Sequence, residues 1–256
     1  MSRELLMKLL NWIKNLFKKE SPKSEAPSKP NPSETPSSSK PIEPQEKMGL
    51  FADISRYEPC DFSKFNGKFL IFKATDGGTW VDPTMQKNID ECKKRGINYG
   101  VYHFYRTGTD PIVQAKLFIS KVGLENLKSC FYEPILDFET VSNPRVGQVQ
   151  DWKMLKDDLQ DAIKFLDYVY EQTGRRCIFY TYESLLDSLD LPSVFVEKCP
   201  KLWIARYSLK KPVKFDPWLK PWAWQYSDGT FSDNPIFKDS FNGIGRCDAN
   251  ILWDEI

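Results

Sequence analysis

Residues 99–139, YGVYHFYRTGTDPIVQAKLFISKVGLENLKSCFYEPILDFE, place two short apolar runs on either side of a helical stretch. The runs YGVYHF (99–104) and EPILDFE (133–139) are rich in aromatic and β-branched residues, which favours β-strands. Between them, residues around 110–122 keep apolar side chains at helical spacing. A strand, a helix and a second strand in this order are typical of a parallel sheet.

The same pattern extends in both directions along the chain. A helix is predicted over 151–173, where Gly174 stops it, and another over 83–95, before Gly96. Alternation through the first five strands, followed by closely spaced strands, predicts an α/β fold: a β/α barrel closed by a mostly β segment. The predicted strands cover 50–55, 69–74, 99–104, 133–139, 177–182, 202–207, 222–227 and 247–252.

The first 47 residues differ in composition from the rest. Residues 1–20 carry a net charge of +3, and their leucines, Trp12, Ile13 and Phe17 fill one arc of an amphipathic helix. Such a helix suits either an anionic membrane surface or a groove on a protein. Residues 21–47, with seven prolines and seven serines, are predicted to form a disordered linker, which leaves 48–256 as the main folded domain.

Neither a membrane span nor an export signal is apparent in the sequence. The longest early apolar run is Leu5-Leu6-Met7, and lysines interrupt what would be the core of a signal peptide. We therefore expect synthesis in the cytoplasm without a signal peptide. Residues 49–256 have a net charge of −2, which argues against a nucleic-acid partner.

Cofactor and metal motifs are also missing from the sequence. The six cysteines are never closer than 22 residues, so no CxxC motif exists, and we expect buried, reduced thiols. The single histidine, His103, excludes multi-histidine metal sites. Without a Walker or GxGxxG loop, no nucleotide cofactor is indicated, and the sequence predicts neither a cofactor nor a metal.

Carboxylates gather where the predicted strands end. Asp137 and Glu139 are two apart on one strand, so their side chains share a face, and crowding raises the pKa of one of them as a general acid requires. The alternative is an ordinary strand exit with solvated acids. Further acids at strand ends are Asp53, Asp76 and, at the start of the last strand, Asp248.

Aromatic and hydrogen-bonding residues at the strand ends suit sugar rings, which have apolar faces and polar edges. The competing interpretation is that these rings fill the core. His103 is equally open to a structural or a substrate-contacting role, since it could face the barrel interior. The candidates include Tyr105, Tyr180, Trp203, Trp224 and Gln225.

In their order and spacing, the motifs of residues 49–256 resemble those of glycoside hydrolase family 25, the lysozymes of phages, fungi and actinomycetes. The matching motifs are GLFADIS, FLIFKATDGGTWVDP, YGVYHFYR, ILDFE, IFYTY, LWIARY, WAWQYS and GRCDAN. The resemblance implies an irregular barrel of eight strands and fewer than eight helices. It also implies hydrolysis of the β-1,4 bond between N-acetylmuramic acid and N-acetylglucosamine in bacterial peptidoglycan, the expected partner of the protein.

By this likeness Glu139 is the general acid, and Asp137 orients either a water or the substrate's own 2-acetamido group. Retaining, inverting and substrate-assisted courses all stay open. Asp53 and Asp248 would complete the catalytic set. The expected sugar-binding residues are Tyr180, His103, Tyr105, Trp203, Trp224, Gln225 and Asp76.

The chain departs from the family pattern at two positions, with Glu58 where glutamine is usual and Asp76 where glutamate is usual. Neither touches the LDFE pair, so an active enzyme is expected. The leading hypothesis is a phage-type lysozyme that acts on the cell wall after release. The alternatives are a catalytically silent peptidoglycan-binding protein and a virion structural component with accessory lytic activity.

Overall fold

The computed structural model describes residues 49–139, 152–189, 191–229 and 240–255. The helix expected over 1–20 and the linker expected over 21–47 lie outside these residues and stay predictions. Among the described residues, no helix has the length and the apolar character needed to cross a membrane.

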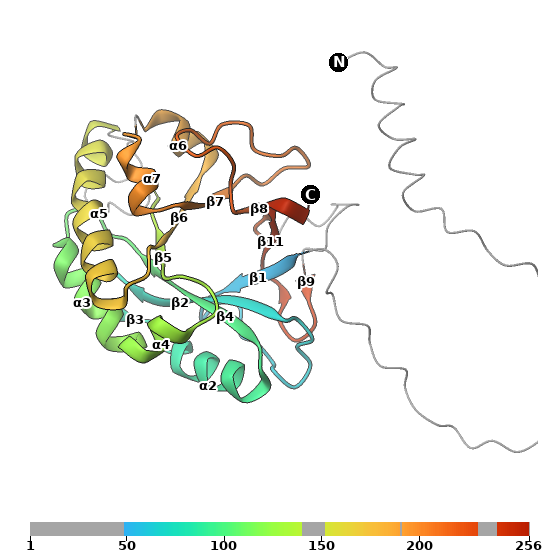
Figure 1. The fold of residues 1–256 in the computed structure, drawn as a ribbon. Helices are drawn as coiled ribbons and strands as arrows, with labels where there is room; N and C mark the ends of the chain where they lie inside the picture. The colour runs from blue at the N-terminus through green and yellow to red at the C-terminus, as the bar shows by residue number, and fades with distance from the viewer. Residues whose placement is uncertain (1–48, 140–151, 190, 230–239, 256) are drawn as a thin grey trace, which may run out of the picture. The chain divides into compact units, whose positions relative to one another are not determined.

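Eight strands close into a barrel, and all eight match strands predicted from the sequence (Figure 1). Seven of them run parallel in the order of the chain, while the last is antiparallel to both of its neighbours. The barrel strands are β1 (Leu50–Ile54), β2 (Phe69–Asp76), β4 (Asn98–Phe104), β5 (Ile135–Asp137), β6 (Ile178–Tyr182), β7 (Lys201–Ala205), β8 (Ala223–Ser227) and β11 (Asp248–Leu252). Three short strands are added: β3 (Trp80–Val81), β9 (Ser240–Phe241) and β10 (Gly245–Arg246).

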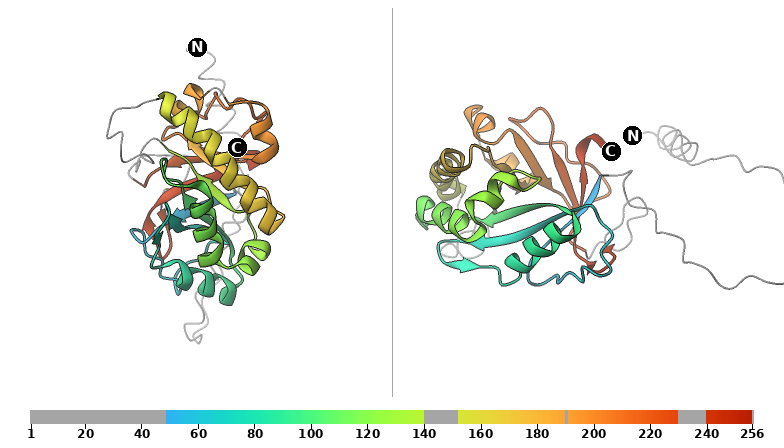
Figure 2. Two further views of the ribbon diagram at one scale, coloured as in Figure 1. Left: turned by 90° about the vertical axis from the view of Figure 1, so that its left-hand side faces the viewer. Right: turned by 60° about the horizontal axis from the view of Figure 1, so that its bottom comes forward.

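Helices lie outside the ring of strands, and α3 and α5 run side by side across it (Figures 1 and 2). The described residues contain six α-helices, so the expectation of fewer than eight is confirmed for that part of the chain. The helices are α2 (Met85–Arg95), α3 (Pro111–Val122), α4 (Leu124–Ser129), α5 (Trp152–Thr173), α6 (Glu183–Ser188) and α7 (Val194–Lys198), with a final 3-10 turn η2 (Trp253–Glu255).

Local sequence explains where the predicted helices begin and end. The carboxylate of Asp110 accepts hydrogen bonds from the backbone N–H groups of Ile112 and Val113, and Pro111 occupies the first turn of α3. Gly96 ends α2 in the left-handed conformation, with φ 66°. The three helices missed from the sequence, α4, α6 and α7, have only five or six residues, too few to show a helical period.

The strands separate two apolar cores by simple alternation of their side chains. In β5 the odd-numbered Ile135 faces the barrel interior, and in β6 the even-numbered Ile178 does so. Their neighbours Leu136 and Phe179 pack outward against the helices. The interior cluster also contains Phe51, Ile71, Tyr132, Tyr180, Trp203, Ala205 and Ala223.

All six cysteines are buried, and burial raises the pKa of Cys60, Cys92 and Cys177 to about 12. The protonated, enclosed thiol is a poor nucleophile. We therefore expect native protein to react with a thiol reagent at least about 10²-fold more slowly than protein in denaturant. Mass spectrometry of timed, blocked samples measures this. Rapid labelling of the native chain, or disulfides in the unreduced chain, would contradict the buried-thiol interpretation.

Candidate active site

Four carboxyl groups from three strands meet at one end of the barrel. Asp53 comes from β1, Asp137 and Glu139 from the end of β5, and Asp248 from the start of β11. Because β11 is antiparallel to β1, its first residue reaches the end at which β1 finishes, and Asp53 pairs with Asp248. They line a pocket of about 180 Å³ together with Ser55, Tyr57, Lys73, Tyr102, Phe104, Tyr180, Trp203 and Gln225.

A second, larger cavity of about 450 Å³ adjoins the first. Glu139 and Tyr180 line both cavities, so Glu139 stands where they meet. The remaining walls come from β6, α6 and the end of β7, through Tyr182, Glu183, Ser184, Ala205, Arg206 and Tyr207. A group that transfers a proton at this junction can reach a bond between two parts of a bound molecule, one in each cavity.

Asp137 and Glu139 form a hydrogen-bonded carboxyl pair. Burial raises the pKa of both groups, and for Asp137 the charge of Glu139 raises it further. Two carboxyls this close cannot both ionise readily, so the pair retains a proton near neutral pH. Among the described residues, the Oδ1 atom of Asp137 is buried without a hydrogen-bond partner. An orphaned acceptor in a pocket is suited to a donor on a bound molecule.

The opposite side of the pocket is held by a chain of side-chain hydrogen bonds. Asn250 donates to Asp53 at 2.7 Å and accepts from the indole N–H of Trp203 at 2.8 Å. Gln225 donates to Asp53 at 3.0 Å and accepts from the hydroxyl of Tyr180 at 2.7 Å. These bonds fix the orientation of Asp53 and of both amides.

Burial and neighbouring carboxylates give Asp53 and Asp248 different acidities. Burial raises the pKa of Asp53 to about 6, although the bonds from Asn250 and Gln225 favour its charged form. Burial, followed by the charge of Asp53, raises the pKa of Asp248 to about 9. The site therefore holds ionised and protonated carboxyls side by side, which is the arrangement that acid–base chemistry needs.

The structure places four of the expected sugar-binding residues away from the pocket. His103 and Tyr105 are buried on the outward face of the barrel, and Trp224 packs outward with its indole N–H on the carbonyl of Arg206. Asp76 is held in ion pairs. For His103, Tyr105 and Trp224 the prediction was wrong about the face of the strand, because alternation defines two faces without saying which one is interior.

The structure brings the other expected residues together, since Asp53, Asp137, Glu139, Tyr180, Trp203, Gln225 and Asp248 share the pocket. Tyr102, one of the aromatic residues at the predicted strand ends, also lines the pocket, as do Lys73 and Phe104, which were not among the expected sugar-binding residues. The signal was present for Phe104, because it alternates with His103 along β4 and must face the other way.

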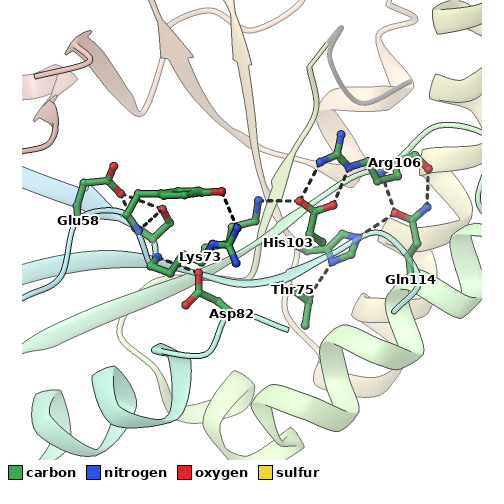
Figure 3. A network of polar contacts seen from close by, with 11 residues as sticks. Glu58, Lys73, Thr75, Asp82, His103, Arg106 and Gln114 are labelled. Atoms are coloured by element: carbon green, nitrogen blue, oxygen red, sulfur yellow. Dashed lines mark hydrogen bonds and ion pairs between the residues drawn. The ribbon is translucent and has the colours of Figure 1, made fainter. Parts of the chain in front are cut away.

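A polar network runs from the pocket wall to the outer face (Figure 3). The Lys73 ammonium donates to Asp76 at 2.8 Å, and Arg106 donates to the two oxygens of Asp76 at 2.6 and 3.0 Å. Behind them, the amide oxygen of Gln114 lies 3.1 Å from the His103 ring and accepts from the Arg106 backbone N–H at 2.8 Å. His103 is thus a structural residue that anchors the loop after β4.

Comparison with known proteins identifies the family. The model for "Glycosyl hydrolases family 25" matches residues 52–233. The chain belongs to this family. It is therefore a glycoside hydrolase, with the carboxyl cluster inside the matched region apart from Asp248. In the part of the chain that the structure describes, no three His, Cys, Asp or Glu side chains are arranged to hold a metal ion.

Relatives of this family 25 hydrolase include the uncharacterized protein YegX of Escherichia coli, 28% identical over 206 residues, or 75% of this chain and 68% of YegX. An autolytic lysozyme of Clostridium acetobutylicum is 30% identical over 161 residues, 62% of this chain and 43% of that protein. The structure of a bacterial lysozyme from Streptomyces coelicolor shares the fold, with a TM-score of 0.64 and 20% identity over 82% of this chain and 94% of that one.

The raised pKa of Asp248 predicts a pH-dependent cost to stability. A carboxyl whose pKa is higher in the folded state binds protons preferentially there, so the chain loses stability as pH rises between the unfolded value near 4 and the folded value of about 9. Asp248→Asn removes this loss. The variant should melt at least about 3 °C above wild type at pH 9, with a smaller or reversed difference at pH 5. Thermal unfolding by circular dichroism tests this, and equal differences at both pH values would contradict it.

Proposed function

We propose that the protein is a lysozyme that hydrolyses the β-1,4 bond between N-acetylmuramic acid and N-acetylglucosamine in bacterial peptidoglycan. The observation that carries this proposal is the proton-sharing pair Asp137 and Glu139 at the junction of two adjoining cavities. The autolytic lysozyme and the N,O-diacetylmuramidase of Arthroderma benhamiae, 25% identical over 202 residues, support this substrate class.

In this mechanism Glu139 is the general acid. It lies at the junction of the cavities, where the oxygen between two sugar units would sit, and it shares a proton with Asp137 because burial raises the pKa of both groups. Transfer of that proton releases the leaving sugar as an alcohol. The hydrogen bond with Asp137 and the charges of Lys73 and Arg106 lower the pKa of Glu139 and so favour release of this proton.

Asp137 orients the group that attacks the anomeric carbon, either a water or the substrate's 2-acetamido group. Its unpartnered Oδ1 is an acceptor for an N–H or O–H of that group. Across the pocket, Asp53 supplies negative charge for the ring that becomes positively charged, and Asp248 beside it supplies a hydrogen-bonding group. Tyr180, Trp203 and Gln225 contribute the aromatic surface and polar edges that a sugar ring needs.

We further propose phage-type lysis, in which the enzyme is made in the cytoplasm and reaches the cell wall after release. The basis is the resemblance of its motifs to those of the family 25 lysozymes of phages.

Glu139→Gln tests the general acid, because glutamine keeps the shape of the side chain but cannot supply the proton. Turnover of purified peptidoglycan, followed by reducing-sugar release, should fall by at least about 10²-fold while the circular dichroism spectrum stays unchanged. Glu133→Gln is the matched control. Glu133 precedes the first residue of β5, at the end of the strand away from Glu139, and forms an ion pair with Lys201 at 2.7 Å. A loss of turnover below about tenfold for Glu139→Gln would contradict the assignment of Glu139 as the general acid.

Asp137→Asn should also reduce turnover, and by at least about 10²-fold, with the fold intact. The amide preserves hydrogen bonding but not the charge or the shared proton. Unfolding of this variant, seen in its circular dichroism spectrum, would show that Asp137 is a structural residue.

We also propose that residues 1–20 contact an anionic membrane surface, since each basic residue near such a surface contributes roughly 1 kcal/mol. The full chain should sediment with anionic vesicles, and a chain starting at Met48 should stay in solution while cleaving membrane-free peptidoglycan at near full rate. Equal partitioning of the two chains would contradict this proposal and leave a protein groove as the target of the helix.

A further inference from the structure

In one wall of the pocket, aromatic rings alternate with cationic side chains. The guanidinium carbon of Arg56 lies 4.7 Å from the ring centre of Tyr57 and 5.3 Å from that of Trp80. The Lys73 ammonium lies 5.4 Å from the Trp80 ring and 4.4 Å from the Phe104 ring, and Arg106 lies 4.5 Å from Phe104. We call these six residues the cation–aromatic wall: Tyr57, Arg56, Trp80, Lys73, Phe104 and Arg106.

This wall borders the reaction site. Tyr57, Lys73 and Phe104 line the same pocket of about 180 Å³ as the four carboxyl groups. Five cation–ring contacts connect these residues in one continuous series, from Tyr57 to Arg106. The rings hold the cations in place and therefore reduce the conformational entropy that each would lose when it binds an anion.

The cations of the wall differ in their pairing with carboxylates. Lys73 and Arg106 both form ion pairs with Asp76. Arg56 is exposed and donates to the hydroxyl of Tyr57 at 2.6 Å, but its guanidinium makes no ion pair with any described residue. The nearby acids are engaged elsewhere: Asp82 accepts from the Arg56 backbone N–H at 3.0 Å and from Thr84, and Glu58 accepts from Ser55 at 2.9 and 3.0 Å.

A carboxylate is the anion that this arrangement fits. Arg56 is exposed next to Tyr57, which lines the pocket, and its guanidinium presents a planar fork of donors; Tyr57, 74% exposed, adds a polar edge beside it. The protonated acids on the pocket floor repel a carboxylate less than four ionised groups would. Lys73 and Arg106 extend the positive potential from the mouth toward Glu139.

We propose that the cation–aromatic wall is a specificity element that recognises a carboxylate on the substrate, with Arg56 as the contacting residue. This inference rests on the proposed function. Peptidoglycan carries carboxylates on its attached peptides and, where the peptide is absent, on the lactyl ether of the muramic acid. Both sources offer the same chemistry to Arg56, so the wall favours anionic over neutralised glycan.

Binding in a Glu139→Gln background tests this proposal without turnover. Sedimentation with insoluble peptidoglycan gives a Kd for three variants added to that background: Arg56→Gln, Arg56→Lys and, as the matched control, Lys121→Gln. Lys121 is exposed at the end of α3 and lines none of the cavities described above. Each is measured on native peptidoglycan and on peptidoglycan whose carboxylates have been amidated.

We expect Arg56→Gln to raise the Kd for native peptidoglycan by about threefold to tenfold, the range for one partly exposed charge-assisted contact. Arg56→Lys should recover part of this loss, and Lys121→Gln should match the background. On amidated peptidoglycan, the Arg56→Gln and background proteins should bind alike. Peptide-stripped glycan separates the sources: an Arg56 effect that persists there assigns the lactyl carboxylate, and one that disappears assigns the peptide.

An Arg56→Gln effect that is equal on native and amidated peptidoglycan, or absent from both, would overturn the proposal while leaving the lysozyme assignment intact. Failure of the wild-type protein to cleave peptidoglycan, with no binding by the Glu139→Gln protein, would instead overturn the proposed function and this inference with it. Thermal unfolding confirms that each variant is folded before its Kd is interpreted.

Discussion

The hydrogen bond from Asn250 to Asp53, 2.7 Å long, joins the last strand of the barrel to the first, and the site depends on that closure. The antiparallel direction of β11 carries Asp248 to the end of the barrel where β1 finishes. A parallel last strand would leave this carboxyl at the opposite end. Trp203 donates to Asn250 from β7, so a single amide ties three strands together around the pocket.

This closure concentrates acid groups in a place with little water. Folding brings Asp53 and Asp248 beside Asp137 and Glu139, and the resulting rise in their pKa values disfavours ionisation of the folded chain as pH increases. The same rise keeps a proton on the pair that is suited to general-acid chemistry. Stability and proposed activity therefore make opposite demands on these carboxyls, as is common at active sites.

The cation–aromatic wall of the pocket is organised by a different principle. Trp80 contacts both Arg56 and Lys73, Phe104 contacts both Lys73 and Arg106, and Asp76 forms ion pairs with Lys73 and Arg106. A pocket with protonated acids on its floor and fixed cations on one side has a directional potential, which favours one orientation of a charged substrate. One pocket of this family 25 hydrolase thus contains a cluster of carboxyl groups, which would stabilise positive charge, and a row of cations, which would bind negative charge.

The sequence by itself determined the eight barrel strands, because each is a short run of apolar, β-branched and aromatic residues bounded by turns or helices. It also determined the Asp137–Glu139 pair, because residues two apart on a strand share a face. Only the tertiary structure decided which face is interior. The register of β2 against β4 shifts between Lys73 and Thr75, so Lys73 lines the pocket while Thr75 turns outward to His103. A bulge reverses the alternation locally and is set by strand pairing, which depends on residues far apart in the chain, so no local pattern could reveal it.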